Sequence, residues 1–300
     1  MKLVIAIGGN ALLRRGEVLS AANQLANIRL AAQQLARVAA AHGELVLTHG
    51  NGPQVGLLAE QDNAYPLDVL GAQTEGMIGY LLEQELSNLL PPERLVSTLL
   101  TRVEVAADDP AFDHPTKPIG PVYSRAQLNA LVAAKDWQLI EDGAGWRRAV
   151  ASPPPLRVLG LEAIRCLLQR CVVVIACGGG GIPVSKRAGM PGLYGIEAVI
   201  DKDLCSAMLA TELAADCLII ATDVAGVSID WGLPSQRLLS AATPQQLAQH
   251  RFAAGSMAPK VAAACAFVNA SGRRAVIGPL DQIEAMLAGQ AGTQITAKLA

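Results

Sequence analysis

The sequence has few aromatic residues, no surplus of either charge and no long apolar run. Phe, Trp and Tyr together make up 3% of the 300 residues, so few side chains could stack on nucleic-acid bases. Lys and Arg number 24 and Asp and Glu 26, which gives a net charge of −2 and no basic surplus to bind nucleic acid or an anionic membrane. We therefore expect a protein that binds neither nucleic acid nor membranes.

The apolar runs are short, although 51% of the residues are hydrophobic. The longest, residues 171–177 and 217–222, fall far below the ~18–20 residues that a membrane-spanning helix needs. Residues 1–13 are interrupted by Gly8, Gly9 and Asn10, so they are not typical of a secretion signal. These features predict a soluble, cytoplasmic chain.

The cysteines form no CxxC pair, and most of them lie in apolar runs. This pattern favours small, buried, reduced side chains over disulfides or zinc ligands. The six are Cys166, Cys171, Cys177, Cys205, Cys217 and Cys265.

Short β-branched runs alternate along the chain with longer stretches at helical spacing. Alternating strands and helices predict an α/β fold, in which helices cover both faces of a mainly parallel sheet. The expected strands are residues 3–7, 44–48, 95–101, 171–177, 217–222 and 274–277. The expected helices are residues 21–41, 53–62, 70–89, 201–215 and 256–270.

Residues 108–155 break this alternation. Seven of the 17 prolines lie in this segment, and proline interrupts both helices and strands. We expect it to be a loop-rich subdomain, or lid, over the functional edge of the sheet. It would be inserted into a single domain that spans residues 1–300.

Glycine clusters follow three of the expected strands. Ligands of open α/β sheets bind beyond the carboxyl ends of the strands, where glycine lets the backbone approach them closely. Consecutive N–H groups in such loops can also surround an anion. Three clusters at matching positions predict a phosphate site. They are Gly8-Gly9-Asn10, Gly50-Asn51-Gly52 and the four glycines 178–181.

Several signatures of other enzyme classes are missing. The sequence contains no GxxxxGK[ST] segment, which argues against a P-loop enzyme, and no GxGxxG fingerprint, which argues against a dehydrogenase. It also contains no HExxH and no GxSxG segment.

Three lysines stand where local rules disfavour them. Lys202 begins one expected helix and Lys260 lies in the first turn of another, where a cation opposes the helix dipole. Lys117 lies between Pro115 and Pro118 in the proline-rich segment. An anion held between these lysines and the helix ends would reverse the unfavourable interaction, and phosphoryl transfer needs such neutralisation. Asp203 would orient the lysines or help to hold a magnesium ion.

These residues belong to segments that together resemble the carbamate kinases, in the amino-acid kinase fold family. The resemblance implies a three-layer αβα sandwich of about eight strands with a protruding subdomain, and a homodimer. It also implies reversible transfer of phosphate between carbamoyl phosphate and ADP, with Mg²⁺, to give ATP and carbamate. The matching segments are residues 6–12, 48–56, 109–112, 115–121, 177–184, 197–204, 255–260 and 292–293.

The resemblance also implies roles for individual residues. Lys117, Lys202, Asp203 and Lys260 would be catalytic, with the lysines neutralising phosphate charge. The residues expected to bind the transferring phosphate and carbamoyl phosphate are Gly8, Gly9, Asn10, Gly50, Asn51 and Gly52. Those expected to bind the nucleotide are Gly178, Gly179, Gly180, Thr222, Val227 and Met257.

Two alternatives remain open from the sequence. One is a kinase of the same fold that phosphorylates another small acid with ATP. The other is a non-catalytic sensor of carbamoyl phosphate or nucleotide. The joint presence of Lys117, Lys202, Asp203 and Lys260 weighs against the sensor, because a protein without turnover would not need them all.

Overall fold

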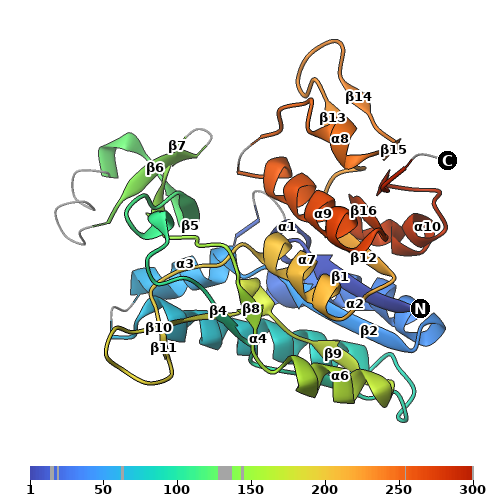
Figure 1. Ribbon diagram of the computed structural model, residues 1–300, viewed down its shortest axis with the longest axis horizontal. Coiled ribbons are helices and arrows are strands. Elements are labelled where there is room, and N and C mark those ends of the chain that lie inside the picture. Colours follow the sequence, from blue (N-terminus) through green and yellow to red (C-terminus); the bar gives the residue numbers. More distant parts are fainter. Residues whose placement is uncertain are drawn as a thin grey trace.

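The structure is a computed structural model (Figure 1). It describes residues 1–13, 17–18, 20–61, 64–127, 137–142, 145–253 and 255–298. The side chains of Asn10, Ala11 and Asp142 lie outside this description.

An eight-stranded sheet forms the centre of the molecule. Neighbouring strands run parallel except for one antiparallel pair, β16 with β17, so the mainly parallel sheet expected from the sequence is confirmed. From one edge to the other the strands are β15 (Ala241–Ala242), β17 (Thr293–Ile295), β16 (Arg274–Pro279), β12 (Cys217–Thr222), β1 (Lys2–Ile7), β2 (Glu44–His49), β9 (Val173–Ile175) and β3 (Val96–Thr98).

Helices cover both faces of this sheet, which gives the three-layer arrangement. Successive strand residues point to opposite faces: Val4 and Ala6 pack into one buried cluster, and Leu3 and Ile5 into the other. Because both faces are buried, the central strands read as continuous apolar runs. The first cluster is covered by α6 (Leu161–Gln169), α7 (Lys202–Glu212) and α9 (Met257–Ser271), and the second by α2 (Ala21–Ala41), α4 (Leu67–Ser87) and α10 (Ile283–Leu287).

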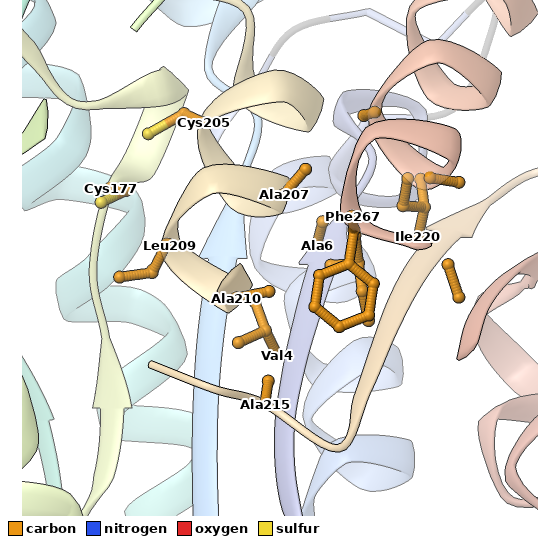
Figure 2. Close-up of a cluster of buried hydrophobic side chains, with 14 of the residues drawn as sticks. Val4, Ala6, Cys177, Cys205, Ala207, Leu209, Ala210, Ala215, Ile220 and Phe267 are labelled. Atoms are coloured by element: carbon orange, nitrogen blue, oxygen red, sulfur yellow. The ribbon is translucent and has the colours of Figure 1, made fainter. Parts of the chain in front are cut away.

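Helices α7 and α9 both begin near the carboxyl ends of the central strands, and both pack against the sheet. Phe267 of α9 is fully buried beside Ala6 and Ile220, and the small residues Ala207 and Ala210 bring α7 close to the strands (Figure 2). Truncating a buried Phe to Ala typically costs about 3–5 kcal/mol. This packing therefore sets where both helices lie on the sheet.

Shorter elements complete the fold. The helices are α1 (Gly9–Leu12), α3 (Gly52–Gln61), α8 (Pro244–Leu247), η1 (Pro110–Phe112), η2 (Gly178–Gly180) and η3 (Leu280–Gln282). A second sheet has the order β11 (Leu193–Gly195), β10 (Ile182–Lys186), β4 (Arg102–Glu104) and β8 (Arg157–Val158). A hairpin pairs β13 (Ser228–Ile229) with β14 (Arg237–Leu238).

The proline-rich segment forms a small sheet of its own, which stands apart from the central sheet in Figure 1. In it β7 (Gly145–Val150) pairs antiparallel with β5 (Lys117–Tyr123) on one side and β6 (Leu139–Asp142) on the other. The described part of this segment thus contains three strands that the sequence pattern did not predict. Pro118 and Pro121 fit into β5 because it is an edge strand, and its register shifts between Ile119 and Tyr123.

The cysteines are less uniformly buried than expected. All six are free, and Cys177, Cys205 and Cys217 are buried. Cys166 and Cys171 are exposed, because one lies on the outer side of α6 and the other follows that helix in a left-handed turn with φ of 58°.

None of the described helices combines the length and apolar character needed to cross a membrane.

Candidate active site

Three parallel strands of the central sheet end side by side. β1 lies between β2 and β12, and Ile7 is level with both His49 and Ala221. Hydrogen bonds join the loops that follow: Gly8 N donates to Ala221 O at 2.9 Å, and Gly50 N donates to Ile7 O at 3.1 Å. Ligands of open α/β sheets bind at such an edge. Two of the three predicted glycine clusters thus lie together there.

The glycines of these two loops serve two different purposes. A Cβ at Gly8 would lie 3.0 Å from Ala221 O, and one at Gly50 would lie 2.9 Å from Gly9 N, so packing accounts for both. A Cβ at Gly9 or Gly52 would have nothing within 4 Å. Gly9 and Gly52 therefore leave open space at the edge of the sheet, where a ligand group can approach the backbone.

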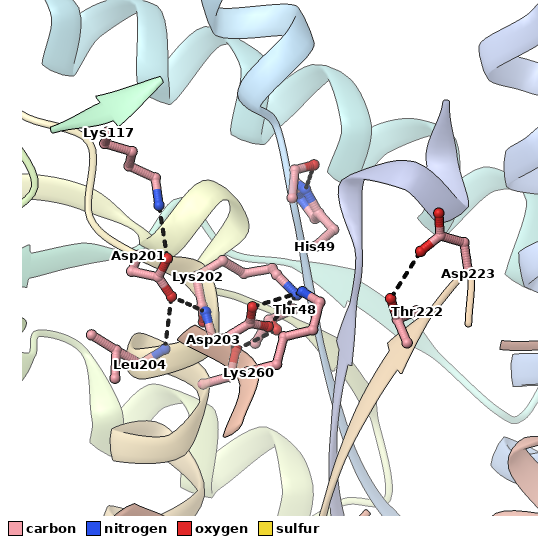
Figure 3. Close-up of polar contacts among 12 residues, drawn as sticks. Thr48, His49, Lys117, Asp201, Lys202, Asp203, Leu204, Thr222, Asp223 and Lys260 are labelled. Carbon is pink, nitrogen blue, oxygen red and sulfur yellow. Dashed lines mark hydrogen bonds and ion pairs between the residues drawn. The ribbon is translucent and has the colours of Figure 1, made fainter. Parts of the chain in front are cut away.

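Three lysines and two aspartates meet at the start of α7 (Figure 3). Lys202 Nζ lies 2.7 Å from Asp203 Oδ1, and Lys260 Nζ lies 2.9 Å from Asp203 Oδ2. Lys117 Nζ reaches from β5 to Asp201 Oδ2 at 2.8 Å. The structure thus brings together all four residues predicted to be catalytic, from three separate elements, and adds Asp201 to them.

Charge and burial oppose each other in this cluster. Burial by itself would raise the pKa of Asp203, but the ammonium groups of Lys202 and Lys260 hold that pKa well below its usual range. Burial lowers the pKa of Lys202, and Lys260 lowers it further, while Asp203 acts against both. The buried Lys202 Nζ finds no hydrogen-bond acceptor among the described residues beyond this ion pair. The site therefore holds cationic donors ready for an anion.

The start of α7 is built by its capping residue. Asp201 Oδ1 accepts hydrogen bonds from the backbone N–H groups of Asp203 and Leu204 at 2.9 and 3.2 Å, so Asp201 is the N-cap of this helix. Lys202 is the first residue of α7, and Lys260 is in the first turn of α9, as predicted. One aspartate therefore both fixes the helix and receives Lys117.

His49 lies fully buried beneath the glycine loops. Its Nδ1 is 3.3 Å from Gly50 O, so the ring is tied to this loop. Burial, together with the charge of Lys202, lowers the pKa of His49 to about 4. The imidazole is therefore neutral at pH 7.

A buried glutamate of α4 lies beside this histidine, and the sequence reading missed it. Glu75 accepts a hydrogen bond from Gly178 N at 2.9 Å and one from Thr101 N at 3.3 Å. Burial raises its pKa to about 8. The sequence did indicate that this glutamate is buried. Glu75 lies three and seven residues before Ile78 and Leu82, which places it on the apolar face of α4.

The tetraglycine segment is tightly packed. A Cβ at Gly178 would lie 2.3 Å from His49 Nε2, one at Gly179 would lie 2.1 Å from Asn51 Nδ2, and one at Gly180 would lie 2.5 Å from Ile200 O. Asn51 Nδ2 also donates to Thr74 Oγ1 at 2.9 Å. Packing against His49, Asn51 and Ile200 therefore accounts for these glycines, and their expected contact with nucleotide stays a prediction.

A cavity of about 840 Å³ opens beside the lysine cluster. Six predicted site residues line it: Gly8, Gly9, Asp203, Thr222, Met257 and Lys260. Asp201 and Asp223 also line it, as do four charged or aromatic residues for which the sequence predicted no role: Arg147, Arg251, Trp231 and Phe252. The cavity thus joins the carboxyl edge of the sheet, the starts of α7 and α9 and the small antiparallel sheet.

The remaining predicted residues lie around this cavity or below it. Lys117 and Lys202 reach its wall through Asp201 and Asp203. Val227 is fully buried in the hydrophobic cluster on the α7 and α9 side of the sheet and does not line the cavity, so its expected contact with nucleotide stays a prediction. The side chain of Asn10 lies outside the described residues.

Comparison with known proteins agrees with this geometry. A model of the Amino acid kinase family matches residues 1–279. A carbamate kinase of Haemophilus influenzae is 52% identical over 304 residues, covering 99% of this chain and 97% of its own. A carbamate kinase of Rhizobium meliloti is 53% identical, covering 99% of this chain and 93% of its own.

A solved structure gives the same result. Carbamate kinase from Giardia lamblia, bound to AMP-PNP, superposes with a TM-score of 0.87 at 37% identity and covers 98% of both chains. Sequence and structure relatives thus share one family over nearly the full chain. The chain belongs to the amino acid kinase family and, within it, to the carbamate kinases.

Proposed function

We propose that this protein transfers a phosphoryl group reversibly between carbamoyl phosphate and ADP, giving ATP and carbamate. The observation that carries the proposal is the sharing of the buried Asp203 carboxylate by Lys202 and Lys260 at the cavity wall. Including Lys117 and Asp201, three ammonium groups face two carboxylates, which leaves one net positive charge for a phosphate to neutralise. Its full-length relatives at about half identity are carbamate kinases.

The proposed reaction proceeds by direct displacement. A terminal phosphate oxygen of ADP attacks the phosphorus of carbamoyl phosphate, and the bond from phosphorus to the carbamate oxygen breaks. Carbamate leaves with that electron pair and then decomposes to ammonia and carbon dioxide. No covalent enzyme intermediate is formed, so catalysis depends on positioning and on electrostatic stabilisation.

Each part of the site has a role in this reaction. Lys202 and Lys260 would neutralise charge that develops on the transferring group, and Asp203 would hold both ammonium groups in place. The open backbone at Gly9 and Gly52 would receive the phosphate groups. Because these groups are fixed before substrate binds, little reorganisation is needed at the moment of reaction.

The donor groups of the cavity fit a magnesium ion that arrives with the nucleotide better than a resident metal ion. Among the described residues no three His, Cys, Asp or Glu side chains are grouped as in a dedicated metal site. Asp223 lines the cavity, and its Oδ1 accepts a hydrogen bond from Thr222 Oγ1 at 3.1 Å. Mg²⁺ that arrives with the nucleotide needs only one or two protein carboxylates beside the nucleotide phosphates, and Asp223 would be that protein ligand. When bound, the ion would neutralise charge on the nucleotide phosphates.

The small antiparallel sheet would act as the inserted lid of a single domain. It carries Lys117 to Asp201 and contributes Val122 and Arg147 to the cavity wall. We include in the proposal that residues 108–155 form this inserted unit and that Lys117 contacts carbamoyl phosphate.

The proposal extends to assembly and location. Met77 and Tyr80 of α4 and the neighbouring Leu100 are exposed, and Leu100 lies beside Gly76. This apolar face supports a homodimer, which the molecular mass in solution would test. Six free cysteines support a reducing compartment such as the cytoplasm.

The test is ATP formation from ADP, Mg²⁺ and carbamoyl phosphate, measured against an enzyme-free control. We expect rapid turnover that is lost in Lys202→Ala. Folded protein that binds ADP but forms no ATP from carbamoyl phosphate would contradict the proposed substrate, and a panel of acyl phosphates in the same assay would then identify another.

A further inference from the structure

Helix α3 and strand β5 cross at a contact between two glycines. A Cβ placed on Gly56 would lie 2.0 Å from both Cα and N of Gly120. Real Cβ atoms are not found so close to other heavy atoms, and both contacted atoms belong to the backbone, so neither can move aside alone. The crossing therefore requires glycine at position 56.

Position 56 is otherwise a poor place for glycine. It lies within α3, where glycine is less favourable than alanine. The preceding residue Val55 is fully buried and packs in a small core with Ile119 of β5, so the two elements are already in firm contact. The close backbone approach gives a physical reason for the glycine.

The other side of the crossing is an irregular point of β5. Gly120 has a φ of +75°, a conformation that favours glycine, and the pairing of β5 with β7 shifts register just after Ile119. The carbonyl of Gly120 accepts a hydrogen bond from Arg147 Nε at 2.9 Å, and Arg147 lines the cavity. The crossing is therefore tied directly to the cavity wall.

A short, regular piece of strand joins the crossing to Lys117. Lys117 begins β5, three residues before Gly120, and Lys117, Pro118 and Ile119 pair in register with β7. The Lys117 ammonium lies 2.8 Å from Asp201, whose other carboxylate oxygen caps α7. A shift of β5 at Gly120 is therefore passed on to the Lys117–Asp201 contact.

We propose that the Gly56–Gly120 crossing positions the Lys117 ammonium at Asp201, so that Gly56 and Gly120 are positioning residues for the phosphoryl transfer although neither lines the cavity. The inference rests on the proposed function, because it assumes that Lys117 serves the reaction. A displacement of about 1 Å can lower a rate by about 100-fold. An added methyl at position 56 forces a shift of that order.

The test is a cycle of three variants: Gly56→Ala, Lys117→Ala and the double variant. Gly71→Ala is the matched control, because this glycine also lies within a helix but a Cβ there would have nothing within 4 Å. We expect Gly56→Ala and Lys117→Ala each to lower kcat with carbamoyl phosphate by roughly 10- to 100-fold. The double variant should be no slower than Lys117→Ala, and Gly71→Ala should equal the wild type.

The outcomes separate the inference from the proposed function. If Lys117→Ala is as active as the wild type, the proposed role of Lys117 fails. If Lys117→Ala is impaired but Gly56→Ala is not, or if the losses multiply in the double variant, Gly56 does not act through Lys117 and the inference is overturned. Circular dichroism and ADP binding confirm that each variant is folded.

Gly120→Ala replaces Gly56→Ala in the cycle if the latter does not fold. A Cβ at Gly120 would make only ordinary contacts, the nearest at 3.5 Å, but the positive φ would be strained. We expect a smaller loss of kcat than for Gly56→Ala, again absent in the Lys117→Ala background. A loss that persists in that background overturns the inference.

Discussion

The lysines of the candidate site come from two differently built regions. Lys202 and Lys260 stand on helices that are packed against the central sheet, and they share Asp203, whose side chain is 6% exposed. Lys117 comes from the small antiparallel sheet, and its contact with Asp201 is more open, with side chains 25% and 18% exposed. The buried cluster is shielded from solvent, whereas water screens the open pair more strongly.

This difference suggests that the two regions have different roles in the reaction. A buried, doubly paired carboxylate holds its two ammonium groups in one geometry, and such preorganised charge is the main source of stabilisation in phosphoryl transfer. The partly exposed Lys117–Asp201 pair contributes less to stability than a fully shielded pair would, so we expect Lys117 to exchange Asp201 for a substrate anion at low cost. We therefore regard the sheet-anchored region as the fixed half of the site and the small sheet as its adjustable half.

The largest expected effect is on the fixed half. Lys202→Ala or Lys260→Ala removes a cation aimed at the transferring group, and we expect kcat to fall by about 100- to 1,000-fold or more. In either variant Asp203 keeps one of its two partners, so the protein should remain folded. Steady-state kinetics and thermal unfolding, with the exposed Lys186→Ala as the control, would measure both. Near-normal kcat in both variants would contradict the assignment.

A smaller effect, of a different kind, is expected on the adjustable half. Lys117→Ala should lower kcat by about 10- to 100-fold and also raise KM for carbamoyl phosphate, while the Kd for ADP stays near that of the wild type. Initial rates at varied carbamoyl phosphate, together with calorimetric titration of ADP, would separate the two. An isolated loss of ADP affinity would place Lys117 in the nucleotide half and break the comparison.

The same contrast governs what could be predicted from the sequence. In the sheet-anchored region, α2 and β12 begin and end where the apolar pattern placed them, because both faces of the sheet are buried and periodicity records that burial. Strands β3 and β9 are shorter than expected. Residues 171 and 177 on either side of β9 have positive φ, a turn conformation that hydrophobicity does not reveal.

The small sheet was harder to predict because its residues satisfy tertiary constraints. Proline in β5 is compatible with an edge strand and a register shift, and neither is visible before the partner strand is known. The contact of Asp201 with Lys117 was not predicted, because the two residues lie 84 positions apart and no local pattern links them. The glycine cluster predicted that the backbone at Gly178 is closely approached by another group. The groups that approach it are His49 and Glu75, which lie in distant segments of the sequence.

The last expected effect is on stability rather than on kcat. It concerns the support beneath the fixed half, where Glu75 accepts a hydrogen bond from the backbone N–H of Gly178. Its pKa is raised to about 8 by burial, against 4.5 as the unperturbed value, so the folded protein retains a proton that the unfolded chain releases between these pH values. The unfolded state then binds fewer protons, and the free energy of unfolding must fall as pH rises from about 5 to about 8, by at most about 1.4 kcal/mol per pH unit.

Glu75→Gln removes this titration. Denaturant unfolding at pH 5, 6.5 and 8 should show wild-type stability approaching that of the variant as pH rises. His49, whose pKa is lowered to about 4, changes stability in the opposite direction below about pH 6.5, but it is present in both proteins and cancels in their difference. Parallel stability curves would mean that Glu75 is already ionised in the folded protein. The support of the fixed half would then be a buried carboxylate held by backbone N–H groups rather than a neutral acid.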